Sequence, residues 1–223
     1  PVALVVIMGG LVLCSLWVPN AQPSNQGRKP HEGGFFKQLR SPGVIAFYVT
    51  VALMQLSHGP YYTFITLHLE SLGYSRGVIG MLWALGVVAE VLMFLAMRRI
   101  LLKFSLRRVL MASFALAALR WLLLGSFAEY LWVLLLAQLM HAATFGSFHA
   151  SAMSFVQRSF GPGQQGQGQA LYATLAGMGG AAGALYAGYS WNTLGPTITF
   201  SMASLAALAA AVIIATRLQE DRA

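Results

Sequence analysis

Five ionisable side chains lie inside long apolar stretches of this sequence: His58, Glu90, Arg120, His141 and His149. An ionisable group near the middle of a bilayer costs at least about 2.5–3.5 kcal/mol on insertion scales, so each of the five needs an explanation. Such groups pair with one another, bind a substrate or carry a proton. The five residues are therefore the first candidates for the chemistry of this chain.

Two of the histidines share one apolar stretch. His141 and His149 are eight residues apart, which on one helix places them on nearly the same face and about 12 Å from each other. This spacing does not suit one metal ion, whose ligand nitrogens lie about 2 Å away, so no metal is expected. Titratable groups at successive depths are typical of a proton relay, and a structural hydrogen bond is the alternative role. For Glu90 and Arg120 the alternative is a mutual ion pair, because buried charges pair.

A second group of polar residues surrounds a predicted kink. Gln55, His58 and Tyr62 share one helix face, and Gly59 and Pro60 weaken the helix between them. Membrane helices that bend at polar groups often line a substrate cavity. The aromatic residues at a similar estimated depth are Trp83, Trp121, Phe145 and Phe148.

The composition dictates which elements position these side chains. Of the 223 residues, 57% are hydrophobic and 9% are charged, whereas a soluble domain has about 25% charged residues. A soluble domain, a disordered chain and a collagen-like fibre are therefore excluded. The single cysteine, Cys14, excludes a disulfide framework.

Seven apolar runs are near the ~20 residues that a helix needs to cross a bilayer. The runs are continuous rather than alternating, which argues against a barrel. We expect an all-α, polytopic membrane protein with seven transmembrane helices, at 2–18, 43–67, 77–97, 109–127, 131–157, 170–191 and 197–216.

Charge in the connections predicts the orientation. Four basic residues and one acidic residue lie in 20–42, and five basic residues lie in 98–108, whereas the opposite side has Glu70, Arg76 and Glu129. The positive-inside rule then places the two basic connections and the C-terminus in the cytoplasm. The basic residues behind the net charge of +8 are therefore attributed to the orientation of the chain in a lipid bilayer. No nucleic-acid partner is expected.

The order of the segments predicts four parts. Residues 1–19 are interpreted as the last helix of a missing N-terminal six-helix bundle, and 20–42 as a cytoplasmic linker with three prolines. Residues 43–216 form a C-terminal six-helix transmembrane bundle, and 217–223 a cytoplasmic tail. Small residues every fourth position allow close helix packing in lipid, and the residues expected to provide it are Gly179, Gly180, Gly183 and Gly188.

Several motifs carry a family resemblance over 37–216. They are His-Gly-Pro-Tyr-Tyr-Thr-Phe at 58–64, Ala-Glu at 89–90, Arg-Trp at 120–121, Gln-Leu-Met-His at 138–141 and Thr-Phe at 144–145. With them the chain resembles a transporter of the major facilitator superfamily, closest to the 3-phenylpropionic acid transporter family. That family is similar to the lactose-permease-type proton symporters.

The resemblance implies roles for particular residues. The proton-coupling network of the lactose-permease-type symporters is matched by Glu90, Arg120 and His141. His149 is expected to extend this network. The acidic residue that lactose permease has one turn after its histidine is Thr144 here, so Glu90 is the remaining acidic candidate. The residues expected to bind substrate are Gln55, His58, Tyr61, Tyr62, Trp83, Arg120, Gln138 and Phe145.

We therefore expect the C-terminal half of a proton-coupled symporter in a bacterial inner membrane. It moves a small organic anion, such as an aromatic carboxylate of the phenylpropionate type, by alternating access. The proton gradient drives it, with no cofactor and no enzymatic activity. The alternatives are a sugar or nucleoside proton symporter and a truncated, non-transporting remnant. A retinal protein fails because every lysine is in a connection, and a hydrolase fails because Ser147 and His149 point apart on a helix.

The orientation can be tested by labelling single cysteines in intact cells, with Cys14 replaced. A membrane-impermeant maleimide should leave a cysteine at Ser105 unmodified, because that connection is predicted to be cytoplasmic, and should modify one at Ser71. The reverse pattern would overturn the predicted topology.

Overall fold

The computed structural model describes residues 8–10, 12–14, 16–17, 34–161 and 163–218. The chain divides into two units, Pro1–Pro30 and His31–Ala223. In the first unit, residues 8–10, 12–14 and 16 are helical. The rest of the predicted span 2–18, most of the predicted linker 20–42 and the tail 219–223 lie outside the described residues.

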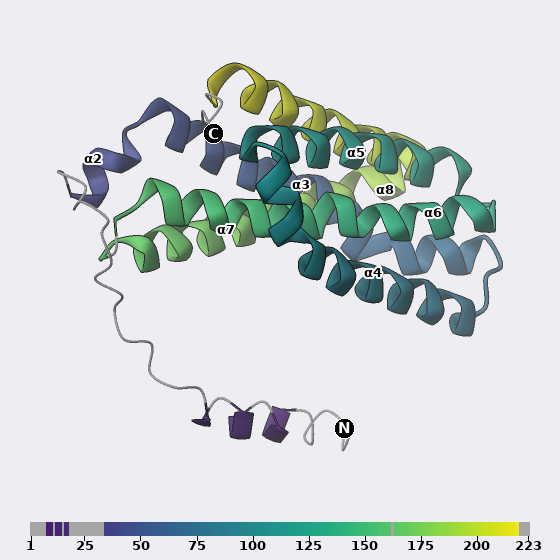
Figure 1. Cartoon of the computed structure of the whole chain (residues 1–223). Helices are drawn as coiled ribbons and strands as arrows, with labels where there is room; N and C mark the ends of the chain where they lie inside the picture. The colour runs from purple at the N-terminus through teal and green to yellow at the C-terminus, as the bar shows by residue number, and fades with distance from the viewer. Residues whose placement is uncertain (1–7, 11, 15, 18–33, 162, 219–223) are drawn as a thin grey trace. The chain divides into compact units, whose positions relative to one another are not determined.

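The second unit consists of helices, and none of its described residues forms a strand. A short helix α2 (Phe35–Leu39) precedes α3 (Pro42–Ser71), α4 (Arg76–Lys103) and α5 (Leu106–Phe127), as Figure 1 shows. One further continuous helix consists of α6 (Leu131–His141), the π-helical turn η1 (Ala142–Gly146) and α7 (Ser147–Ser159). The last element is α8 (Gln165–Arg217).

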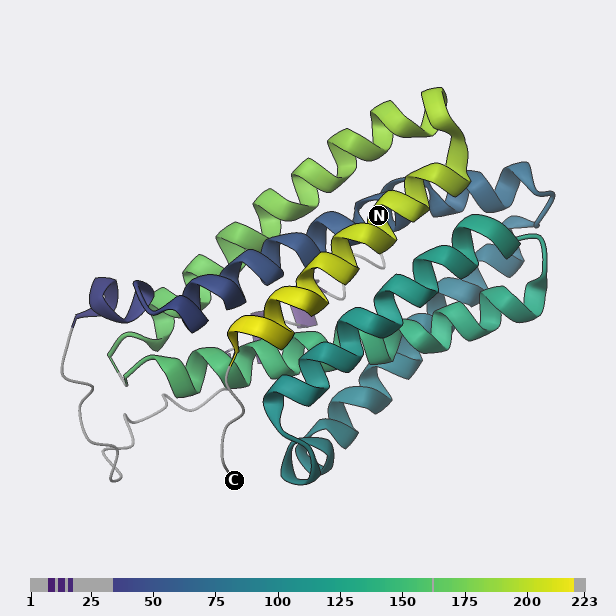
Figure 2. The same ribbon diagram turned by 90° about the horizontal axis from the view of Figure 1, so that it is seen from above.

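Helix α8 is two helices joined by a sharp turn. Its backbone leaves the helical region at Gly195 (φ 85°, ψ 171°), immediately before Pro196. Glycine adopts a positive φ at little cost, and proline cannot donate the hydrogen bond that would continue the helix. Figure 2 shows the two arms of α8, light green and yellow, turning back at this point. Residues 42–217 thus form six long helical segments, which match the six predicted spans in this region.

The helices extend beyond the predicted spans. The sequence predicted a basic connection over 98–108, but α4 continues through Arg98 and Arg99 to Lys103, and Ser105 already caps α5 by accepting from the Arg108 N–H. Hydropathy identifies only the part of a helix that lies in hydrocarbon, whereas arginine and lysine are good helix formers and prolong it. At the predicted kink, α3 remains one continuous helix through Pro60.

Among the described residues, four helices are long and apolar enough to cross a membrane: α4, α5, the continuous helix Leu131–Ser159 and α8. Helix α3 has 30 residues, but Gln55, Ser57 and His58 make its middle more polar. The helical fold class is confirmed by these elements, whereas the number of seven transmembrane helices stays a prediction.

Backbone contact between α3 and the first arm of α8 determines how closely these helices pack. A Cβ on Gly183 would lie 2.6 Å from the Leu56 carbonyl oxygen and 3.0 Å from the Gly59 Cα. A Cβ on Gly179 would likewise be too close to the backbone of Ala52. Gly180 and Gly188 have nothing among the described residues within 4 Å of a Cβ, so their role in packing stays a prediction.

This difference predicts opposite effects of two neighbouring substitutions. Gly183→Ala should destabilise the chain by about 1–3 kcal/mol, because the new methyl group must push α8 away from α3. Gly180→Ala is the control, and it should be neutral or slightly stabilising because alanine favours a helix. Thermal unfolding of the purified variants in detergent measures both, and equal melting temperatures would contradict the packing described here.

Candidate functional site

The centre of the site is Arg120 on α5, whose side chain is completely buried (0% exposed). Its Nε donates a 2.8 Å hydrogen bond to the Ala137 carbonyl oxygen on α6. The guanidinium carbon lies 4.2 Å from the Tyr61 ring centroid and 4.6 Å from that of Trp121. The two terminal nitrogens, Nη1 and Nη2, are buried and make no hydrogen bond to any described residue.

This arrangement leaves one edge of the guanidinium available. Nε and the two aromatic faces hold the group, and cation–π contacts of this kind stabilise a buried cation. The free nitrogens carry four N–H groups in a planar fork, which matches the two oxygens of a carboxylate. The two unpaired nitrogens of Arg120 are therefore the donors at this site that match an anion.

Aromatic rings from five elements, α3, α4, α5, α6 and η1, gather around Arg120. Tyr61 lies 4.9 Å from Trp83 and 5.8 Å from Trp121 between ring centroids. Tyr62 stacks on Trp83 at 6.3 Å and is 49% exposed, so the cluster opens toward the outside of the bundle there. The rings of this aromatic cluster belong to His58, Tyr61, Tyr62, Trp83, Trp121, His141 and Phe145.

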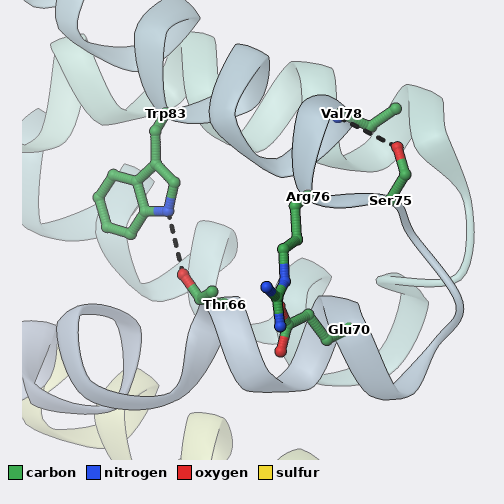
Figure 3. A network of polar contacts seen from close by, with 6 residues as sticks. All are labelled: Thr66, Glu70, Ser75, Arg76, Val78 and Trp83. Carbon is green, nitrogen blue, oxygen red and sulfur yellow. Dashed lines mark hydrogen bonds and ion pairs between the residues drawn. The ribbon is translucent and has the colours of Figure 1, made fainter.

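Two hydrogen bonds fix the walls of the cluster. The Tyr61 hydroxyl donates to the Gln138 Oε1 at 2.8 Å, which joins α3 to α6. The Trp83 indole N–H donates to the Thr66 Oγ1 at 3.2 Å, which joins α4 to α3 (Figure 3). Farther along the same two helices, Arg76 and Glu70 form a 3.0 Å ion pair. The polar atoms of Tyr61 and Trp83 are thus engaged, and these residues offer ring surface rather than hydrogen bonds.

Glu90 pairs with a histidine rather than with Arg120. The Glu90 Oε2 lies 3.7 Å from the His141 Nε2, and within 34–161 no ion pair joins Glu90 to Arg120. The proposed alternative of a mutual Glu90–Arg120 pair is therefore wrong, because Arg120 points to Ala137 and Tyr61. Glu90 also lies against η1, where a Cβ on Gly146 would be 3.2 Å from its Cγ.

The π-helical turn aligns a row of rings on the continuous helix. Phe145 stacks on His141 at 5.4 Å and on His149 at 6.4 Å, with interplanar angles of 12° and 13°. In a regular α-helix a residue eight positions on is rotated by about 80°, so the nearly common face predicted from the spacing of His141 and His149 would not arise there. The wider π turn, with i→i+5 hydrogen bonds, removes most of this rotation. His149 then reaches α8, where its Nδ1 lies 3.0 Å from the Tyr172 hydroxyl.

A comparison with known proteins decides the family. Residues 1–202 match the family described as "MFS_1 like family". The chain belongs to this family, within the major facilitator superfamily. It is also 30% identical over 202 residues to an Escherichia coli (strain K12) protein named "Probable 3-phenylpropionic acid transporter", covering 89% of this chain and 52% of that protein. The chain thus spans about half the length of this curated relative, and no solved structure matches it.

Membership of the MFS_1-like family and the apolar helices identify a multi-pass membrane protein that belongs to a family of transporters rather than of enzymes. The hydroxyl that a hydrolase would need is engaged elsewhere, because Ser147 hydrogen-bonds to Ser113 at 2.7 Å. In the described part of the chain, no three His, Cys, Asp or Glu side chains gather to hold a metal.

The structure brings together most, but not all, of the predicted site residues of this MFS_1-like chain. Gln55 is half-buried and makes no hydrogen bond within the described region. His149 belongs to a separate layer with Tyr172 and Phe94. Sequence reasoning did not assign a role to Trp121, although its position next to Arg120 in the Arg-Trp motif is a local signal. It also gave no role to Gly146 or Tyr172, which only the packing of helices reveals.

Proposed function

We propose that this chain is the C-terminal half of a proton-coupled symporter that moves a small aromatic carboxylate. The observation that carries the proposal is the buried guanidinium of Arg120, with both terminal nitrogens unpaired inside a ring of aromatic side chains. The fork binds the carboxylate with two charge-assisted hydrogen bonds. The aromatic cluster receives the ring of the substrate.

The chemistry of the site supports an aromatic acid over a sugar. A sugar needs several free hydrogen-bonding groups, whereas the amide oxygen of Gln138 and the indole N–H of Trp83 are already bonded within the protein. Ring faces around a single cation suit a planar apolar body with one negative group. The name of the curated relative, a 3-phenylpropionic acid transporter, describes a substrate of this class.

The proton is proposed to bind at the Glu90–His141 pair. These side chains lie 3.7 Å apart, which is close enough for electrostatic coupling. A proton would pass between them once a side-chain movement brings them within hydrogen-bond distance, about 2.6–3.2 Å. His141 also lies beside Tyr61, which covers Arg120, with ring centroids 5.6 Å apart. An anion on Arg120 neutralises the guanidinium and so favours a proton nearby, because like charges repel. This electrostatic link would couple the substrate to the proton, and His149 would extend the path along η1 and α7.

The remaining features follow the family architecture. The substrate would bind near the bilayer midplane between two bundles, as in other secondary transporters. The partner bundle would be an N-terminal set of six helices, of which 1–19 is the last. By the positive-inside rule, the basic connections favour a C-terminus on the cytoplasmic side of a bacterial inner membrane.

Substitution of Arg120 tests the substrate site. In the full-length protein, Arg120→Lys should weaken the binding of 3-phenylpropionate more than tenfold, beyond ~1.4 kcal/mol, because an ammonium cannot provide the planar fork. His58→Phe retains the ring and should weaken binding less. Isothermal calorimetry, normalised to folded protein, measures both affinities.

The neutral analogue 3-phenylpropan-1-ol provides the control for Arg120. The wild-type protein should prefer the acid, and Arg120→Lys should remove most of this preference without changing the binding of the alcohol. If Arg120 served only to hold α5 on α6, the substitution would reduce the yield of folded protein and leave the affinity of the remainder unchanged. Wild-type affinity for the acid would end the proposal.

Substitution of Glu90 tests proton coupling. Glu90→Gln in the full-length protein should abolish uphill accumulation of substrate in proteoliposomes, because the neutral amide cannot carry the proton. Exchange of preloaded substrate should persist, since it needs no net proton movement. Glu70→Gln, at the Arg76 ion pair, is the control and should accumulate substrate normally. Accumulation by Glu90→Gln under a proton gradient would remove Glu90 from the mechanism.

A further inference from the structure

A polar cavity lies at one end of the bundle, away from the aromatic cluster. It has a volume of about 380 Å³ and forms where α3 and α5 begin and where α7 and α8 end. The polar residues that line it are Gln38, Ser41, Arg107, Ser159 and Arg217. None of these residues takes part in the transport site.

Arg107 is anchored at the cavity but retains unused donors. Its Nη2 donates a 2.5 Å hydrogen bond to the Ala215 carbonyl oxygen in the last turn of α8. Its Nε is buried and has no hydrogen-bond partner among the described residues. A buried donor without a partner costs free energy, which a bound acceptor would recover. Arg217 lines the same cavity from the end of α8.

The first turn of α3 adds backbone donors. Gly43 and Val44 line the cavity, and the first N–H of α3 with a helical partner is that of Ile45, which donates to the Ser41 carbonyl oxygen. The Ser41 side chain makes no capping hydrogen bond. The positive end of a helix of 30 residues therefore faces the same space as the two arginines.

No carboxylate neutralises this positive region in the described chain. The acidic residues that the structure describes are Glu70, Glu90 and Glu129, and none of them lines the cavity. Two arginines, hydroxyl groups and free backbone N–H groups form a donor set for a tetrahedral oxyanion. Apolar side chains of Val44, Leu106 and Phe155 complete the wall, which suits a group that also carries a hydrocarbon part.

We propose that this cavity binds the phosphate of an anionic phospholipid headgroup. The cavity lies at the ends of membrane-crossing helices, where headgroups are found, and basic pockets between helices on the cytoplasmic side bind such lipids. The positive-inside rule assigns this end to the cytoplasmic leaflet, which contains the anionic lipids. The lipid would bridge the start of α3 and the end of α8, the first and last helices of the bundle.

Native mass spectrometry of the full chain in detergent tests the site, with phosphatidylglycerol as the probe. The wild-type chain should retain one phosphatidylglycerol more tightly than phosphatidylcholine. Arg217→Gln and Arg107→Gln should each weaken this binding about five-fold, the equivalent of about 1 kcal/mol per basic residue near a membrane surface. Arg107→Lys should restore most of the affinity, which separates charge from the hydrogen bond to Ala215.

Control variants and a competitor define the outcomes. Lys103→Gln removes a charge from the same end of the bundle but outside the cavity, and Arg76→Gln removes one at the Glu70 ion pair. Both should bind phosphatidylglycerol normally, and a loss equal to that of Arg217→Gln would overturn the proposal by showing a diffuse charge effect. Inorganic phosphate at millimolar concentration should not displace the lipid. Displacement, or equal binding of phosphatidylcholine, would also overturn the assignment to an anionic headgroup.

Discussion

The burial of one positive charge determines how the helices around it can be arranged. Arg120 is surrounded by protein in an apolar bundle, where an isolated cation is very costly. The cost is reduced by the Ala137 carbonyl oxygen and by the faces of Tyr61 and Trp121. Each of these partners must itself be held, so Tyr61 is fixed by Gln138. The helices α3, α5 and α6 therefore meet at a common point.

The close packing of α3 and α8 serves the same centre. Gly59 and Gly183 bring the two backbones into contact, and Gly59 directly follows His58 and lies two residues before Tyr61. A larger residue at either glycine would move α3 and with it both rings. Packing and site geometry are thus linked through one helix, which carries the Tyr61 ring that lies over the Arg120 guanidinium.

The positions of the helices could be predicted from the sequence, whereas the contacts between helices could not. Apolar run length identified the central parts of the six helices of 42–217 but not their ends, because entry into hydrocarbon depends on local composition. The partner of Glu90 was not predictable, because the direction of a side chain between helices depends on the rotation of each helix. Gly180 and Gly183 belong to the same spacing pattern, and only the position of Leu56 distinguishes them. The turn η1 contains Ala-Ala-Thr-Phe-Gly, in which no proline marks the irregularity.

The π-helical turn has a consequence for mapping this protein by mutation. Helical positions are usually assigned to faces by projecting the whole helix onto a single wheel of 3.6 residues per turn. Across 131–159 this projection fails, because η1 inserts a wider turn and shifts the phase of all that follows. The periodic pattern of tolerated and harmful substitutions should therefore change phase within 142–146. Two helical-wheel projections, one for α6 and one for α7, are needed to describe this one continuous helix.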